Sequence, residues 1–281
     1  MMTHTSTHIA TVQALESMAR EMRHDIYRMG LQTGLNGAHF GGGLSLVEIM
    51  AVLYQSVMRV NPAQPRWPER DRFILSKGHG AMAYYAALKQ VGFVTDEDLM
   101  TFKGNHTFLY GHPSMNPDKG IEFSSGSLGL GLALGVGTAM GLRKRGNHAS
   151  RVFVLMGDGE CGEGSVWESA ASAAHFGLSN LVAIIDKNGL QYDGPTKDVL
   201  NMDGMAEKWE SFGWQARTVD GHNLAELLDA FDNLGGKPTV IVANTVKGKG
   251  VSYMENNPAW HHNRLTQAQF DELTAAKAVN P

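Results

Sequence analysis

Apolar runs and segments with helical periodicity alternate along most of this sequence. The runs at 152–156 and 181–185 each hold five consecutive apolar residues, which is typical of parallel strands buried on both faces. Shorter apolar stretches predict three more strands, at 72–75, 214–219 and 239–245. Between them the pattern predicts helices at 12–29, 45–58, 81–91, 126–143 and 163–176, and another that begins at Asn223. This alternation predicts an α/β fold: a doubly wound, mainly parallel sheet with helices on both faces.

Capping signals mark three of the helix starts, each a polar residue followed three positions later by an acidic one. The pairs are Ser45 and Glu48, Thr95 and Asp98, and Asn223 and Glu226. The segment 103–125 is expected to be irregular, and no linker divides the chain. We therefore expect a single domain over 1–281, with a short flexible N-terminus at 1–10 and a C-terminal tail at 266–281.

Composition excludes several classes of protein. The formal net charge of −4 argues against nucleic acid or an anionic membrane as a partner, because these favour a basic face. A single cysteine excludes an intrachain disulfide and a Cys-rich metal site. The N-terminus lacks the apolar core of a signal peptide, and no apolar run approaches the roughly 20 residues that span a bilayer. These features predict a cytoplasmic protein.

Two strand ends carry polar residues that suit an anion and a metal. Gly157-Asp158-Gly159-Glu160 follows one buried strand, and Asn188 follows the next. Since ligands of parallel sheets bind beyond the carboxyl ends of the strands, Asp158 and Asn188 are expected to face one crevice. A carboxylate and an amide oxygen suit Mg²⁺, which completes its shell with phosphate and water. Gly157 and Gly159 let backbone N–H groups approach a diphosphate.

Gly-Asp-Gly followed about thirty residues later by Asn resembles the thiamine diphosphate motif, and the segment 152–196 resembles transketolase. Three further motifs match in the same order: Ser-Lys-Gly-His-Gly at 76–80, Gly-His-Pro at 111–113 and Lys-Gly-Lys-Gly at 247–250. The resemblance covers about 24–265. It implies the thiamine diphosphate-binding fold of that family, with thiamine diphosphate and Mg²⁺ (or Ca²⁺ or Mn²⁺) as cofactors.

The resemblance also implies roles for individual residues. Its metal ligands are the side chains of Asp158 and Asn188 and the carbonyl of Leu190. Its cofactor-binding residues are His79, Gly126, Ser127, Leu128, Gly157, Asp158, Gly159, Glu160 and Asn188. Its catalytic residues are His39 and His112 in the substrate channel, His261 near the thiazolium ring, and Glu163 and Glu168 in a network between paired active sites.

The histidine pattern fits this chemistry. Imidazoles in loops beside Gly-rich turns suit proton transfer near neutral pH. The family usually has His-Gly where this chain has His261-His262, so either histidine fits the motif; the spacing from 247–250 favours His261. His222 is interpreted as part of a turn and helix cap.

A full transketolase chain is more than twice as long and continues into a pyrimidine-binding domain, which carries the glutamate that activates the cofactor. The resemblance therefore implies the N-terminal subunit of a split transketolase, which transfers a two-carbon ketol unit between sugar phosphates. It would need a separate C-terminal subunit, with which it would form a two-plus-two heterotetramer through a self-dimer.

Three other interpretations stay open at this point. One is the alpha subunit of a 2-oxo acid dehydrogenase, and another is 1-deoxyxylulose-phosphate synthase, normally a single long chain. The third is a non-catalytic relative with the same fold. The motifs at 111–113 and 247–250 favour transketolase over the dehydrogenase. Donor and acceptor sugars are left open, with pentose and hexose phosphates as the default and a dedicated catabolic ketose phosphate or a sulfonated sugar as alternatives.

Overall fold

The computed structural model describes residues 4–232 and 234–275. Residues 1–3 of the expected N-terminal segment and 276–281 of the expected tail lie outside the described residues. The helices are α1 (His4–Gln32), α2 (Phe40–Leu44), α3 (Val47–Val52), α4 (Ala81–Gln90), α5 (Asp96–Leu99), α6 (Gly131–Lys144), α7 (Gly164–His175), α8 (Thr196–Val199), α9 (Met205–Ser211), α10 (Leu224–Phe231) and α11 (Gln267–Ala275). The strands are β1 (Arg72–Leu75), β2 (Val152–Gly157), β3 (Leu181–Lys187), β4 (Leu190–Gln191), β5 (Gly194–Pro195), β6 (Gln215–Asp220) and β7 (Thr239–Asn244).

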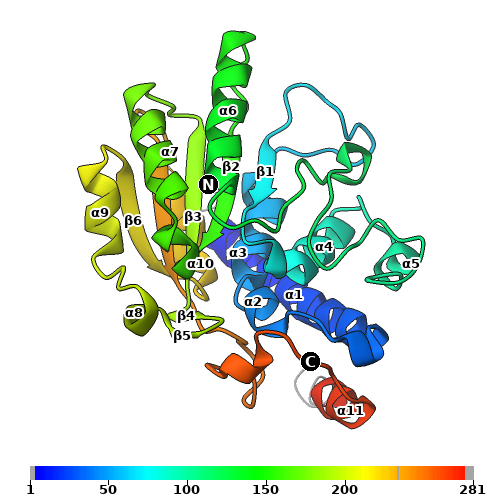
Figure 1. Ribbon diagram of the computed structural model, residues 1–281. Coiled ribbons are helices and arrows are strands. Elements are labelled where there is room, and N and C mark those ends of the chain that lie inside the picture. The colour runs from blue at the N-terminus through cyan, green and yellow to red at the C-terminus, as the bar shows by residue number, and fades with distance from the viewer. Residues whose placement is uncertain (1–3, 233, 276–281) are drawn as a thin grey trace.

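The main sheet has five parallel strands in the order β1-β2-β3-β7-β6. Strands β1, β2, β3 and β6 are added across the sheet in the same direction. The helices α6, α7 and α9, which lie between these strands in the sequence, cover one face of the sheet (Figure 1). From β6 the chain returns to β7, which places α10 on the opposite face with α1 and α3, as right-handed crossovers require. The predicted doubly wound parallel sheet is confirmed.

Alternate side chains of each central strand supply two separate apolar layers. Phe153 and Leu155 of β2 pack with α1 to α4 and α10. Val154 and Met156 of the same strand pack with α6, α7 and α9. Because both faces are covered, the sheet is buried throughout its centre, which explains the continuous apolar runs in the sequence.

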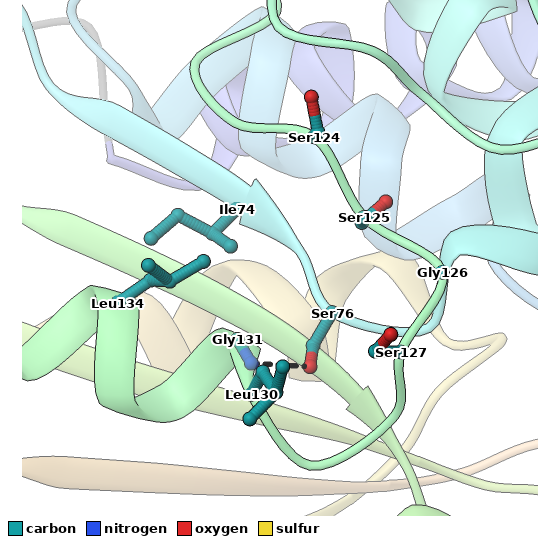
Figure 2. A pocket seen from close by; sticks show the side chains of 9 residues that line it. All are labelled: Ile74, Ser76, Ser124, Ser125, Gly126, Ser127, Leu130, Gly131 and Leu134. Carbon is teal, nitrogen blue, oxygen red and sulfur yellow. Dashed lines mark hydrogen bonds between the residues drawn. The ribbon is translucent and has the colours of Figure 1, made fainter.

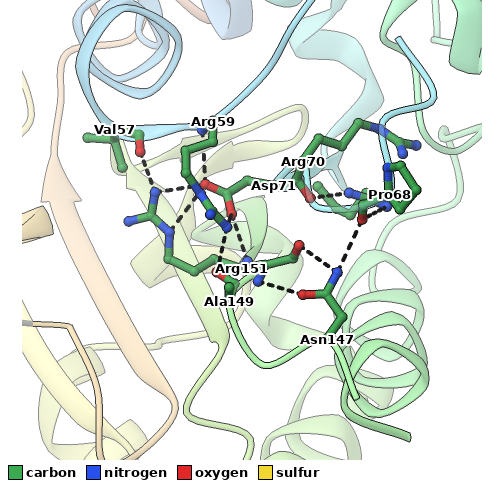
Figure 3. Close-up of polar contacts among 10 residues, drawn as sticks. Val57, Arg59, Pro68, Arg70, Asp71, Asn147, Ala149 and Arg151 are labelled. Carbon is green, nitrogen blue, oxygen red and sulfur yellow. Dashed lines mark hydrogen bonds and ion pairs between the residues drawn. The ribbon is translucent and has the colours of Figure 1, made fainter. Parts of the chain in front are cut away.

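A buried carboxylate fixes the start of the sheet. Asp71 precedes β1 and accepts hydrogen bonds from the backbone N–H of Arg59 (3.0 Å) and of Arg151 (2.8 Å) (Figure 3). It also accepts from the guanidinium groups of both arginines, at 3.2 and 2.7 Å. These bonds hold the ends of β1 and β2 together and place Arg72 opposite Val152.

Two of the three predicted caps are confirmed. Thr95 and Asp98 form a reciprocal capping box at α5, and Asn223 caps α10. The prediction for Ser45 is wrong: this residue follows the end of α2, and α3 begins at Val47 without a side-chain cap. Its hydroxyl instead donates to the buried carboxylate of Asp186 (2.7 Å), a tertiary partner that the local pattern does not show.

Helix boundaries differ from prediction where glycine allows unusual backbone. Helix α6 begins at Gly131 rather than after Gly126, because Gly126 and Gly129 have φ values of 144° and 84°. Helix α1 begins at His4, before the predicted start at residue 12. Within the described ranges, no helix is long and apolar enough to cross a bilayer.

Candidate active site

Asp158 lies directly beyond the carboxyl end of β2 and is only 4% exposed. Its carboxylate accepts hydrogen bonds from the backbone N–H of Gly159 (2.8 Å) and of Gly189 (2.7 Å). Burial, assisted by nearby Asp186, raises the pKa of Asp158 above its ordinary value. Asp158 and Asn188 line one cavity of about 250 Å³, so the structure brings the two strand ends together.

Three residues that line this cavity carry hard oxygen atoms. They are Asp158 with its carboxylate, Asn188 with its side-chain amide and Leu190 with its backbone carbonyl. Asn188 Oδ1 accepts from the backbone N–H of Leu190 (3.1 Å), which folds the turn so that both residues line the cavity. Among the described residues, no group of three or more His, Cys, Asp or Glu side chains is arranged to hold a metal. The oxygen set therefore fits an ion such as Mg²⁺ that takes its remaining ligands from phosphate and water.

Two buried lysines, which the sequence analysis did not assign, line the same cavity. Lys77 is 1% exposed and pairs with Asp186, while Lys247 is 2% exposed and donates to the Leu190 carbonyl (3.0 Å). Burial and the nearby Lys77 ammonium lower the pKa of Lys247 to about 8. These two ammonium groups and the neutral imidazole of His79 give the cavity hydrogen-bond donors that fit a diphosphate.

Asp186, at the end of β3, organises the polar groups beneath the cavity. Its carboxylate accepts hydrogen bonds from Ser45, Lys77, Asn188 (2.9 Å) and Thr245. Although burial opposes ionisation, the Lys77 ammonium and the hydroxyl donors hold the pKa of Asp186 below its ordinary value. This carboxylate therefore fixes Lys77 and Asn188, which come from different loops.

Glu160 connects separate segments around the site through hydrogen bonds to its carboxylate. Its carboxylate accepts from the Ser76 hydroxyl and from the backbone N–H groups of Gly129 (2.8 Å) and Gly157 (3.0 Å). It thereby holds the segment 126–131 against the end of β2.

The segment 126–128 separates two cavities. Gly126 and Ser127 line a neighbouring cavity of about 320 Å³ with Ser76 and Leu134 (Figure 2). Leu128 lines the cavity of Asp158 instead. Gly126 and Ser127 are exposed, so the edge of this segment is open to a partner.

The four histidines expected in the site converge from four loops. The ring of His39 lies 5.4 Å from that of His112, 5.5 Å from His261 and 6.0 Å from His79, measured between centroids. His79 and His261 are 5.1 Å apart. These side chains form one cluster beside the cavity of Asp158, which His79 and His261 also line.

His261 and His262 occupy different places in this cluster. His261 lines the cavity, and its buried Nδ1 has no hydrogen-bond partner among the residues that the structure describes. His262 is exposed, and its ring lies 4.6 Å from His39 on the outer side of the cluster. The geometry thus directs His261, and not His262, toward Asp158.

Burial keeps the clustered imidazoles neutral. It lowers the pKa of His39 to about 3, with further repulsion from His262, and that of His261 to about 4, with repulsion from Lys247. The pKa of His79 is also lowered by burial and by Lys77. Near pH 7 each ring therefore has one N–H donor and one acceptor nitrogen, as proton exchange with hydroxyl and carbonyl groups requires.

Hydrogen bonds to the backbone connect the loops that carry the clustered histidines. Ala38 and Asn263 exchange two backbone hydrogen bonds, of 2.8 and 3.0 Å. Lys103 has a left-handed φ of 56° and donates to the carbonyl of Gly37 (2.7 Å). The loop of His39 is therefore joined to the loops of His261 and His112. The sequence analysis did not identify Lys103, because neither its type nor its spacing separates it from a surface lysine.

Of the two glutamates expected between paired active sites, the first is the N-cap residue of α7 and the second lies in the second turn of this helix. Glu163 and Glu168 are exposed, and Glu163 also lines the cavity of Asp158. Their exposure leaves both carboxylates accessible to another chain.

Comparisons with known proteins identify the family of this chain. The family described as "Transketolase, thiamine diphosphate binding domain" matches residues 25–281. An Actinobacillus succinogenes protein, named as one subunit of apulose-4-phosphate transketolase, is 41% identical over 88% of this chain and 90% of its own length. The SqwG subunit of the 6-deoxy-6-sulfo-D-fructose transketolase of a Clostridium species is 39% identical over 86% of this chain and 88% of its own length.

Solved structures agree with these matches. Transketolase from Campylobacter jejuni superposes with a TM-score of 0.85 at 27% identity, over 95% of this chain. The match spans 43% of the solved chain. Together with the cavity of Asp158 and the histidine cluster, these comparisons show that the chain belongs to the transketolase family and forms its thiamine diphosphate-binding domain.

Proposed function

We propose that this chain is the cofactor-binding subunit of a two-chain transketolase, active only with a separate C-terminal subunit that carries the pyrimidine-binding domain. Two relatives named as single subunits of apulose-4-phosphate transketolase match it over about nine-tenths of their length, whereas transketolase from Campylobacter jejuni is more than twice as long as the region matched. The reaction is transfer of a two-carbon ketol unit between ketose and aldose phosphates in the cytoplasm.

The observation that carries the proposal is a single cavity lined by Asp158, Asn188 and Leu190 and also by two buried lysines. Asp158, Asn188 and the Leu190 carbonyl would hold Mg²⁺. Lys77, His79 and Lys247 would hold the diphosphate, with the backbone of Gly157 and Gly159 beside it. Ca²⁺ or Mn²⁺ would use the same oxygens, because these ions also prefer carboxylate and carbonyl ligands.

When bound, thiamine diphosphate supplies the carbon centre and the electron sink for cleaving a ketose. The histidines of this chain then handle the sugar's protons. His39 and His112, neutral and at the open side of the cluster, bind hydroxyl groups of the sugar. His261, which lines the cavity, exchanges a proton with the reacting oxygen.

We also propose a two-plus-two assembly in which α7 forms the self-dimer contact. Supporting it are the exposed carboxylates of Glu163 and Glu168 at the start of this helix. Large apolar side chains of the adjacent α6 are exposed as well, including Leu134 (38%) and Met140 (37%). Such side chains are typical of surfaces that another chain covers. Sedimentation of the isolated chain as a monomer would contradict the self-dimer.

The substrate proposal is a ketose phosphate, with pentose and hexose phosphates tested first. Two relatives are named for apulose-4-phosphate and one for 6-deoxy-6-sulfo-D-fructose, so these sugars form the second panel. Ketol transfer by the purified chain without a C-terminal subunit would contradict the proposed need for a partner.

The cofactor site is tested by calorimetric titration with thiamine diphosphate and Mg²⁺. We expect Asp158→Ala to weaken binding at least tenfold, about 1.4 kcal/mol, because the metal loses its carboxylate. The matched control is Asp203→Ala, which removes an exposed carboxylate. If the chain alone does not bind, the titration is repeated with a C-terminal subunit present. Failure to bind in both states would contradict the cofactor site.

A further inference from the structure

A chain of polar contacts joins the outer helices to the turn that carries Lys247. Arg23 of α1 donates to Glu48 Oε1 (2.6 Å), and the other Glu48 oxygen lies 3.0 Å from His222 Nδ1. His222 Nε2 accepts the backbone N–H of Val246 (2.8 Å). The three side chains are largely buried, with exposed fractions of 17%, 10% and 12%.

The contacts determine which nitrogen of His222 carries the proton. A backbone N–H can only donate, so Nε2 is the acceptor and has no hydrogen. The neutral ring therefore carries its proton on Nδ1 and donates it to Glu48. Burial favours the neutral acid, but His222 and Arg23 together hold the pKa of Glu48 below its ordinary value. The ionised carboxylate of Glu48 thus stabilises the His222 tautomer whose Nε2 can accept the N–H of Val246.

The turn after Val246 has little freedom to move independently. The N–H of Gly248 donates to the Gly41 carbonyl (3.1 Å). Gly248 has a φ of 82°, and a Cβ there would lie 2.3 Å from the carbonyl oxygen of Met254. Because the N–H groups of the residues before and after Lys247 are both held, its side chain is directed to the Leu190 carbonyl in the cavity.

We propose that His222 is a positioning residue that, with Glu48 and Arg23, holds the Val246 peptide so that Lys247 projects into the cofactor cavity. The inference depends on the proposed function only in that the diphosphate occupies this cavity. It also extends the interpretation of His222 as part of a turn and helix cap. Asn223 provides the cap, and His222 is committed to Glu48 and Val246.

The test compares His222→Leu with His222→Gln in the full chain. Leucine removes both hydrogen bonds, whereas glutamine keeps one donor and one acceptor on a side chain of similar reach. For His222→Leu we expect faster amide exchange at 246–248 and at least tenfold weaker binding of thiamine diphosphate with Mg²⁺. We expect His222→Gln to keep most of the wild-type protection from exchange at 246–248 and most of the wild-type cofactor affinity. The control is Thr95→Ala, which removes a helix cap far from the turn and costs about 1 kcal/mol of stability.

Wild-type exchange rates and cofactor affinity in folded His222→Leu would overturn the inference, as would the same changes in Thr95→Ala. If His222→Leu does not fold, Glu48→Gln takes its place, since it removes the charge that selects the tautomer. A ring proton on Nε2 in the wild-type ¹⁵N spectrum would overturn the inference as well. If the wild-type protein binds no cofactor either alone or with a C-terminal subunit, the proposed function fails, but the exchange rates still decide the role of His222.

Discussion

Lys77 is a buried cation whose charge is balanced by one carboxylate, that of Asp186. We expect Lys77→Met to lower the free energy of unfolding by about 3–5 kcal/mol, because it leaves a buried negative charge without its partner. Urea unfolding followed by far-UV circular dichroism measures the loss. Lys237→Met, which changes an exposed loop lysine, is the control. A loss below about 1 kcal/mol for Lys77→Met would show that the remaining donors, two hydroxyl groups and the Asn188 amide, satisfy Asp186.

Single residues of the site were predictable where a strand end fixes their place. Asp158 and Asn188 follow buried strands, so the parallel sheet alone brings them to one edge. Lys77 and Lys247 were not predicted, because lysine in a Gly-rich loop usually projects into solvent. Their burial depends on Asp186 and the Leu190 carbonyl, which lie in other segments. The motifs at 76–80 and 247–250 contain these lysines and could have pointed to them. A motif match, however, indicates the family and does not indicate that the lysine places a charge in the site.

At the scale of elements, α6 has glycines on two faces with opposite consequences. A Cβ at Gly135 would lie 2.5 Å from the Val154 side chain, whereas Gly141 has open space. We expect Gly135→Ala to destabilise the isolated chain by about 1–3 kcal/mol through overpacking against β2. Gly141→Ala is the matched control and should stabilise it by about 0.5–1 kcal/mol through helix propensity. Equal effects in thermal unfolding would contradict the assignment of the two faces.

Helices and strands were predictable from the hydrophobic periodicity and from the residues that interrupt it. The errors in the predicted boundaries have local causes. The parallel strands were found because both faces are covered, so their residues are continuously apolar. The predicted helix at 45–58 is shorter because Ser45 pairs with Asp186 instead of capping, and a π-helical turn follows α3 over Leu53–Val57. The short elements β4, β5 and α8 form around the Asn188 turn, where polar residues give no periodic signal.

For the molecule as a whole, the neutral histidine cluster predicts a loss of stability in acid. Between about pH 6.5 and 4 an unfolded chain binds protons on His39 and His261, whereas burial prevents this in the folded chain. Since the unfolded state then holds more protons, the free energy of unfolding falls as the pH falls through this range. We expect the melting temperature to decrease accordingly in a scan from pH 7 to pH 4.

Replacing the titrating groups separates this effect from that of the carboxylates. The double variant His39→Asn, His261→Asn should show a shallower decrease in melting temperature over the same range, because two of the rings that resist protonation are gone. His148→Asn, a change at an exposed ring outside the cluster, should keep the wild-type slope. Equal slopes in all three proteins would mean that the cluster does not contribute to acid sensitivity.

The bridge between Ala38 and Asn263 has a consequence for biosynthesis. It joins two loops that lie more than two hundred residues apart in the sequence, so the histidine cluster cannot close on a nascent chain before Asn263 has been synthesised. At roughly 5–20 residues per second, the ribosome takes on the order of ten to forty seconds between these residues. The sheet has time to form first, and the site closes last. Chains terminated between β7 and His261 would therefore keep the sheet but lack the cluster, so only chains extended past Asn263 would present a complete site for the sugar.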